Sequence, residues 1–229
     1  MTVASLSILS PCCVRLTDFK NLAEASLKPP KTIMQKLTAE DLFTLEHYAR
    51  IRNKFRSQVM EHKTHRRLAL GEHAALYFED RLTMQYQVQE MLRIERIFEA
   101  KGIEDELEVY NSLIPDGSNW KATFMLEYGD VEERKAALAR LIGIEHKLWM
   151  QLKGFDRVRP VANEDMDRTT AEKTAAVHFV RFELTPPMVE AVKTGAAISA
   201  GIDHPAYTVS VELPPEVRAA LAADLDFKH

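Results

Sequence analysis

Hydrophobic residues recur at helical spacing in a long segment near the start of the chain. Apolar positions follow one another every three or four residues from Thr38 to about Lys63, which predicts a helix with one face against a core. These positions are Leu42, Leu45, Tyr48, Phe55 and Val59. Thr38 is followed three residues later by Asp41, the spacing of a capping box, so we expect the helix to begin there.

A second amphipathic helix is predicted over residues 81–100, and Gly102 is expected to end it. Its apolar stripe is formed by Met84, Val88, Met91 and Phe98. Between the two helices, the segment RRLALGEHAALYFED places apolar residues on both sides of Gly71, which predicts a β-hairpin. A short acidic helix over residues 103–114 follows, and the sequence Pro-Asp-Gly then predicts a turn at residues 115–117.

Alternating and continuous apolar runs dominate the second half of the chain. The predicted strands are WKATFMLEY, HKLWMQLKG paired with RVRPVA, AAVHFVRFELT, AAISAGI and AYTVSVEL. The predicted helices are VEERKAALARLIG, PPMVEAVKTG and PPEVRAALAADL, two of which open with prolines suited to a first helical turn. Short connections such as the turn at residues 203–205 favour antiparallel pairing. We therefore expect an α+β fold, with a helical part and β-hairpin followed by a mainly antiparallel sheet with short helices.

The pattern divides the chain into three expected parts. Residues 1–33 are Ser-rich, lack sustained periodicity and end near a Pro-Pro pair, so we expect a poorly structured N-terminal extension. Residues 34–118 form the helical part with its hairpin, and residues 119–229 form the antiparallel α+β part. The last two parts could equally make one continuous domain.

Composition and charge narrow the classes of function. A net charge of −4 and a pI near 6.1 do not favour nucleic acid or an anionic membrane as a partner. The only cysteines, Cys12 and Cys13, are adjacent, so neither a thiolate metal site nor a disulfide framework is expected, and we place the protein in a reducing cytoplasm. Apolar runs are too short for a membrane span, and nucleotide-loop and H-E-x-x-H motifs are absent. We expect neither a cofactor nor a metal.

Residues 61–73, EHKTHRRLALGEH, hold three of the eight histidines and allow three interpretations. His62 and His65 are three residues apart, so one helix face could present both to a metal. Two arginines directly after them oppose a bound cation, so we expect a helix end and a hairpin without metal. The third interpretation is a surface facing an anionic partner, although a solvated helix face explains the same charges. The candidate partner-binding residues are Arg50, Arg56, Arg66 and Arg67.

Four polar residues stand at positions where they could contact a ligand. Glu95 falls on the predicted core-facing stripe, where it needs a partner as an ion pair or as a catalytic acid. Alternation in AAVHFVRFELT places His178 on the buried face and Arg181 on the other face. His178 is either a hydrogen-bonded core histidine or a general base. His204 precedes a proline, so a turn role alone explains it, but it could also join a polar ligand site.

Several long segments resemble, in order, the bacterial family known as domain of unknown function 3501. These segments are LALGEHAALYFEDRLTMQYQVQEMLRIERIFE, SLIPDGSNWKATFMLEY, KTAAVHFVRFEL and GIDHPAY. The resemblance spans about Met34 to Leu225 and brings no catalytic residues with it. Members of the family are often encoded beside rubrerythrin-like and iron–sulfur oxidoreductase proteins. The resemblance therefore implies a redox context and a partner of that kind.

Three functions follow from these observations. The first is a non-enzymatic accessory protein that docks onto a redox enzyme. The second is an enzyme or small-ligand-binding protein with a polar site around His178 and Arg181. The third is a nucleic-acid binder, which the acidic net charge and the lack of interleaved basic and aromatic residues disfavour.

Overall fold

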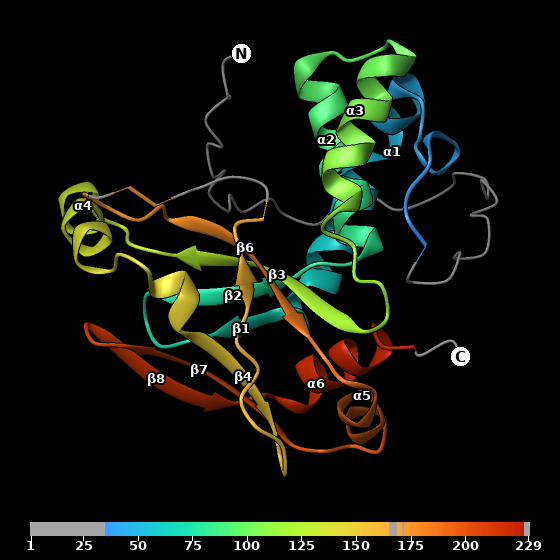
Figure 1. The fold of residues 1–229 in the computed structure, drawn as a ribbon. Coiled ribbons are helices and arrows are strands. Elements are labelled where there is room, and N and C mark those ends of the chain that lie inside the picture. Colours follow the sequence, from blue (N-terminus) through green and yellow to red (C-terminus); the bar gives the residue numbers. More distant parts are fainter. Residues whose placement is uncertain (1–34, 165–168, 171, 227–229) are drawn as a thin grey trace, which may run out of the picture. The chain divides into compact units, whose positions relative to one another are not determined.

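A computed structural model, shown in Figure 1, describes residues 35–164, 169–170 and 172–226. The extension expected at residues 1–33 lies outside the described residues, as does part of the polar connection around residue 167. The described elements are helices and antiparallel strands, which confirms the predicted α+β class. None of the described helices combines the length and the apolar composition needed to cross a membrane.

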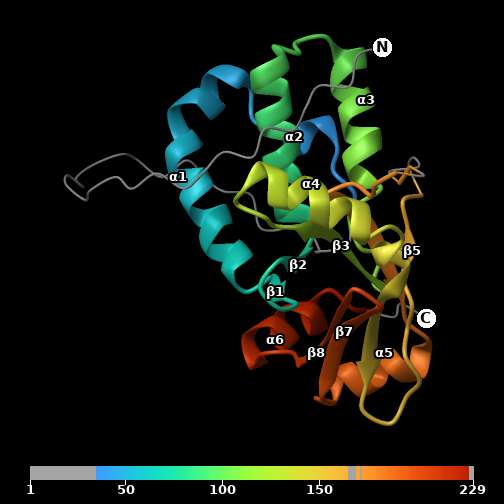
Figure 2. The same ribbon diagram turned by 90° about the vertical axis from the view of Figure 1, so that its left-hand side faces the viewer.

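Three helices of the first half form a layer in which α2 lies between the other two (Figure 2). They are α1 (Leu45–Thr64), α2 (Arg81–Glu95) and α3 (Ala100–Asn111). The middle helix buries two faces. Met84 and Val88 belong to a cluster shared with α3, whereas Tyr86 packs against the apolar stripe of α1. Because both sides of α2 are covered, polar residues on its flanks are also drawn into the interior.

The first helix begins later than predicted. The backbone N–H and the hydroxyl of Thr38 both donate to Asp41 Oδ2, at 2.9 and 3.0 Å, so the expected contact is present. It encloses only a short 3-10 helix, η1 (Ala39–Asp41). The α-helix starts after Thr44, whose hydroxyl accepts a backbone N–H of the first turn. A second capping residue therefore sets the beginning of α1.

The second helix ends earlier than predicted. α2 stops at Glu95 because Arg96 adopts a left-handed conformation, with φ of 55°, and the chain turns back into α3. Gly102, which was expected to end the helix, lies in the first turn of α3. Phe98 consequently sits in the connecting turn, and its side chain is exposed.

The larger sheet has the order β1-β2-β3-β6-β5, and every pairing in it is antiparallel. Its strands are β1 (Arg67–Ala69), β2 (Ala74–Phe78), β3 (Asn119–Leu126), β5 (Val161–Ala162) and β6 (Val177–Glu183). The predicted hairpin is β1 and β2, which confirms that expectation. Since β2 pairs with β3, one sheet contains strands from residues 34–118 and from residues 119–229.

The second sheet has the order β4-β7-β8 and is also antiparallel. Its strands are β4 (Leu148–Leu152), β7 (Ile198–His204) and β8 (Tyr207–Glu212). The predicted pairing of HKLWMQLKG with RVRPVA is right only at one bridge, between Met150 and Val158. The next two residues of strand structure, Val161–Ala162, pair with β6 in the larger sheet.

Short helices cover the ends of the sheets and complete the main core. They are α4 (Val131–Arg140), the 3-10 helix η2 (Ile144–Lys147), α5 (Pro186–Lys193) and α6 (Pro215–Ala223). Prolines open α5 and α6, as predicted. Trp120 of β3 is fully buried, and its indole N–H donates to the carbonyl of Leu221 in α6 at 2.9 Å. The core is therefore closed by the C-terminal helix.

Candidate functional site

Arg66 lies two residues after the end of α1, and it is only 3% exposed. Its Nε donates to Asp80 Oδ2 at 3.0 Å, and its two terminal nitrogens donate to the Asp224 carboxylate at 2.8 and 2.5 Å. His62 Nε2 lies 2.5 Å from the same oxygen of Asp80. The prediction that Arg66 offers its charge to a partner is wrong, because two internal carboxylates already use its guanidinium.

The pKa values of the two carboxylates in this cluster are shifted in opposite directions. Burial opposes ionisation of Asp80, but the hydrogen bond from His62 and the charge of Arg66 outweigh it and lower the pKa of Asp80 to about 2. Burial raises the pKa of Asp224 to about 7, although Arg66 acts in the opposite direction. The arrangement is a buried ion network that joins the end of α1, the start of α2 and the end of α6.

Glu90, in the middle of α2, is a buried carboxylate that the sequence analysis missed. It accepts two hydrogen bonds from Arg52 and one from the Tyr48 hydroxyl, each at 2.7 Å, and a longer one from Arg93 at 3.2 Å. Burial would raise the pKa of Glu90, but these donors lower it to about 2. The missed signal is a second stripe at four-residue spacing, in which Glu90 follows Tyr86.

Glu95 is exposed, which contradicts the prediction that it is buried with a partner. The error has a simple physical cause: α2 ends at Glu95, so the stripe that was extrapolated to Phe98 does not continue past it. The carboxylate inside this helix is Glu90, five residues earlier. Glu95 therefore faces solvent at the end of the helical layer.

His178 is fully buried and hydrogen-bonded, as predicted. Its Nε2 lies 3.0 Å from the carbonyl of Ala175 and 2.9 Å from the hydroxyl of Thr174, while Nδ1 faces Asn163 Oδ1 at 3.2 Å. A carbonyl oxygen can only accept, so Nε2 carries a proton. Thr174 also connects the ring to Glu145, whose carboxylate lies 3.9 Å from Nε2.

This His178–Glu145 cluster holds groups that could exchange a proton, and it is closed. The Glu145 side chain is nearly inaccessible and accepts a hydrogen bond from the Thr169 hydroxyl at 2.6 Å. Asn163 has a left-handed backbone, with φ of 56°, a conformation that asparagine tolerates better than most residues. The observed contacts are those of a structural polar cluster between the strand β6 and the helix η2.

Arg181 and His204 do not join His178 in one site. Arg181 lies on the opposite face of β6, as alternation predicted, and donates two hydrogen bonds to Glu164 at 2.8 and 2.7 Å. His204 ends β7, where its Nδ1 accepts the N–H of Ala206 at 3.1 Å and stabilises the turn. His178, Arg181 and His204 thus each have separate partners. Ligand binding by them stays a prediction.

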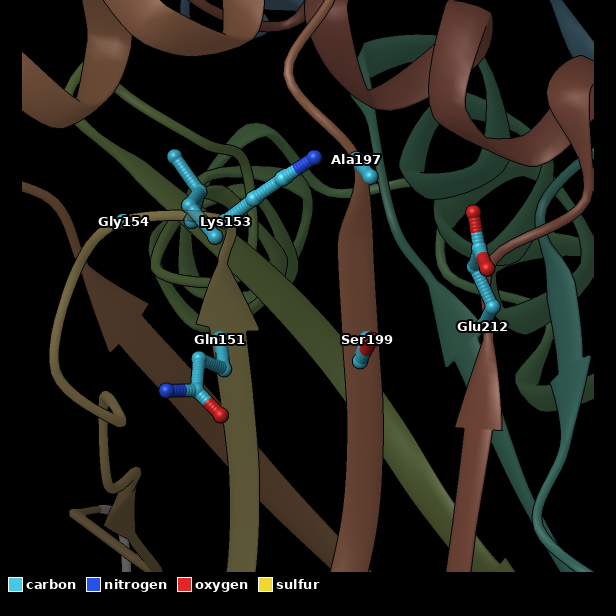
Figure 3. Close-up of a pocket in the computed structure, with 7 residues that line it drawn as sticks. Gln151, Lys153, Gly154, Ala197, Ser199 and Glu212 are labelled. Carbon is cyan, nitrogen blue, oxygen red and sulfur yellow. The ribbon is translucent and has the colours of Figure 1, made fainter.

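A hollow of about 250 Å³ opens on the outer face of the second sheet (Figure 3). Its lining comes from neighbouring strands of this sheet and from the turn after β4. The lining residues are Gln151, Leu152, Lys153, Gly154, Ala197, Ser199 and Glu212. The lining has a serine hydroxyl but no histidine to activate it. None of the residues predicted from the sequence lies in this hollow.

The basic residues on the outer side of α1 have few internal partners. Arg50, Lys54 and Arg56 are exposed, and none of them forms a salt bridge with another residue that the structure describes. Arg56 lies near the Tyr86 hydroxyl of α2. Arg50 Nε donates to the carbonyl of Glu46, one turn earlier. Arg67, on β1, is partly engaged, since it donates to Glu127 and to the Tyr77 hydroxyl, both at 2.9 Å.

The three histidines of residues 61–73 have different surroundings. His62 contacts Asp80, His65 caps the exposed end of α1, and His73 stacks on the ring of Tyr128 with centroids 4.3 Å apart. In the part of the chain that the structure describes, no group of three histidine, cysteine or acidic side chains is arranged to hold a metal ion. The helix end followed by a hairpin is as predicted.

One family model matches most of the chain. The family described as "Protein of unknown function (DUF3501)" matches residues 36–225. A crystal structure of a novel protein of unknown function from Burkholderia pseudomallei K96243 is 47% identical and covers 84% of this chain and all of its own. The two folds superpose with a TM-score of 0.80. Among curated proteins there is no significant match.

Proposed function

We propose that this protein, which belongs to the DUF3501 family, is a non-enzymatic accessory protein that docks onto another protein through the basic face of α1. This basic face consists of Arg50 and Lys54. Arg56 lies one turn after Arg52 and near the Tyr86 hydroxyl of α2, so it does not belong to this face. Its partner would present a matching acidic surface. The family resemblance makes the rubrerythrin-like and iron–sulfur oxidoreductase proteins encoded beside family members the first partners to test.

The proposal rests on one observation: some basic side chains on and next to α1 form internal ion pairs, and others do not. Arg52 on α1 and Arg66 just after it are each held by buried carboxylates, whereas the exposed Arg50 and Lys54 have no ion pair in the described part of the chain. Arg50 and Lys54 are four residues apart and so lie on the same side of the helix. Glu46 and Glu61 flank them, which limits the patch to about two turns.

The buried titratable groups support a non-enzymatic role. Asp80, Glu90 and His178 each make several internal hydrogen bonds, and none of them lines the hollow on the second sheet. General acid–base catalysis needs a group within reach of a substrate proton. These groups instead hold elements together.

Cross-linking of purified proteins tests the proposal. The protein would be mixed with each candidate redox protein and treated with a water-soluble carbodiimide, which activates a carboxylate so that a lysine amine in contact with it forms an amide bond. We expect cross-links from Lys54 to acidic-surface segments of one partner. Lys135 on α4, which is also exposed, serves as the matched control and should give few. Cross-links centred on Lys135, or none with any candidate, would contradict docking through α1.

A second proposal is a small-ligand or enzymatic site near the His178–Glu145 cluster. The observation in its favour is a buried histidine within 3.9 Å of a buried carboxylate, a pairing that recurs at active sites. Such a ligand would have to change the chemical environment of the His178 ring. Imidazole NMR signals that stay unchanged across a library of metabolites would count against it.

A further inference from the structure

The turn between α2 and α3 exposes two large apolar side chains within five residues. Ile94 is 54% exposed and Phe98 is 67% exposed. Between them, Arg96 holds the left-handed conformation that reverses the chain, and Ile97 packs into the cluster shared by the two helices. Burial of Ile97 fixes the turn and leaves Phe98 outside. We call residues 94–99 the α2–α3 tip.

Acidic residues predominate in the segment that contains and follows these apolar side chains. Residues 94–108 contain six acidic residues and two basic ones. Lys101 is already bound to Asp105 at 2.6 Å. Four exposed acids have no salt bridge in the described part of the chain, and these are Glu95, Glu99, Glu104 and Glu108.

Like charges in this region oppose one another. Burial raises the pKa of Glu106, and the nearby Glu95 and Asp105 carboxylates raise it further. A cationic group placed beside Glu95 would relieve this repulsion. Exposed aromatic and branched aliphatic side chains are also the residues that partners bury at interface centres.

From these features we infer that the α2–α3 tip is a second docking surface, which binds a basic amphipathic segment of a partner protein. Phe98 and Ile94 would contact the apolar side of that segment, and Glu95 and Glu99 would contact its lysines or arginines. The inference goes beyond docking through α1, whose basic face needs a partner of the opposite charge. Together the two surfaces would make the protein an adaptor between an acidic and a basic partner.

A defined peptide tests the tip directly. The probe is a synthetic 14-residue peptide that repeats Leu-Lys-Lys-Leu-Leu-Lys-Leu, titrated into the full isotope-labelled chain and followed by NMR. We expect the largest shift changes at residues 94–99. The variant Glu95→Lys with Phe98→Ser should weaken binding at least tenfold. The same peptide with glutamates in place of lysines should not bind the tip.

A control variant on α4 distinguishes specific binding at the α2–α3 tip from nonspecific attraction of a cationic peptide to an acidic protein. Val131 is 48% exposed beside Glu133, so Glu133→Lys with Val131→Ser makes the same chemical change elsewhere. We expect this control to bind the peptide like the unmodified chain. Equal weakening by both variants, or shifts spread over all acidic surfaces, would overturn the inference. Dimerisation of the unmodified chain that is lost in the tip variant would also overturn it, because the occupant would then be a second copy.

The α1 variant Arg50→Glu with Lys54→Glu keeps the two proposals distinguishable. It should bind the basic peptide as well as the unmodified chain does, since the tip is untouched. Loss of peptide binding in the tip variant would leave docking through α1 unaffected. Failure of docking through α1 would likewise leave the tip result standing.

Discussion

Arg66 forms ion pairs with both buried carboxylates of its network. One guanidinium contacts both Asp80, which precedes α2, and Asp224, which follows α6. Without it, two carboxylates would remain in a poorly solvated cluster, and Asp224 would lose the two hydrogen bonds that it accepts from the guanidinium. Removal of one member of a buried ion pair leaves the other uncompensated, which is the costly case.

We expect Arg66→Ala to lower the free energy of unfolding by about 3–5 kcal/mol, the range for breaking a buried ion pair. The matched control is Arg67→Ala, whose partly exposed ion pair with Glu127 should contribute less than about 1 kcal/mol. Urea denaturation of both variants measures the difference. Equal losses would mean that Arg66 does not have the structural role assigned to it.

Glu90 should make stability depend on acid pH. Its pKa in the folded chain is about 2, below the ordinary value of 4.5, so its contribution is present above about pH 4.5 and is lost as the pH falls toward 2. We expect the stability difference between the unmodified chain and Glu90→Gln to shrink over that range. A pH-independent difference for Glu90→Gln would contradict the lowered pKa.

Among the strands, β7 depends on a glycine for its packing. A side chain at Gly201 would place its Cβ 2.4 Å from the ring of Trp149 and 2.3 Å from the carbonyl oxygen of Val209. Neither neighbour can move freely, because one belongs to the paired strand β4 and the other to the backbone of β8. The second sheet is therefore intolerant of any larger residue at this point.

We expect Gly201→Ala to destabilise the protein by about 1–3 kcal/mol, the usual cost of overpacking. Gly129→Ala is the matched control, since a Cβ there meets no atom within 4 Å. That control should be neutral or slightly stabilising, by up to about 1 kcal/mol. Thermal unfolding of the two variants gives the comparison. A neutral Gly201→Ala would show that β4 and β8 can separate at this position.

Elements with a strong local pattern could be predicted from the sequence, and their ends could not. Alternation placed His178 correctly inside β6, and the two proline pairs marked α5 and α6. The end of α2 was misjudged because no glycine or proline marks Arg96, and packing of Ile97 decides the turn. Because of that error, Glu95 was expected to be the buried carboxylate of this helix, whereas the buried one is Glu90.

In the molecule as a whole, the contacts that define the candidate sites join residues far apart in the chain. Arg66 and Asp224 are separated by 158 positions, and Trp120 and Leu221 by 101. Periodicity in one sequence carries no information about such pairs, so Arg66 was counted as a free surface cation. Arg50 and Arg56, which need only a local helix to be exposed, were assigned correctly to the surface.

Leu221 holds α6 against the core. Leu221 is fully buried and its carbonyl accepts the Trp120 indole N–H. We expect Leu221→Ala to cost about 2–5 kcal/mol, the range for a buried leucine that leaves a cavity. Ala219→Ser, at an exposed position of the same helix, should cost less than about 0.5 kcal/mol. Tryptophan fluorescence during urea denaturation reports both values, and equal stability of the two variants would contradict closure of the core by α6.

Charge reversal on α1, read at two salt concentrations, tests docking most directly. The affinity of the redox partner identified by cross-linking would be measured for the unmodified chain, for Arg50→Glu with Lys54→Glu, and for the α4 control Lys135→Glu with Arg140→Glu. We expect the α1 variant to bind at least tenfold more weakly at about 50 mM salt and the gap to narrow at about 500 mM, because salt screens exposed charges. The α4 control should bind like the unmodified chain. Equal affinity of all three chains at low salt would contradict docking through α1.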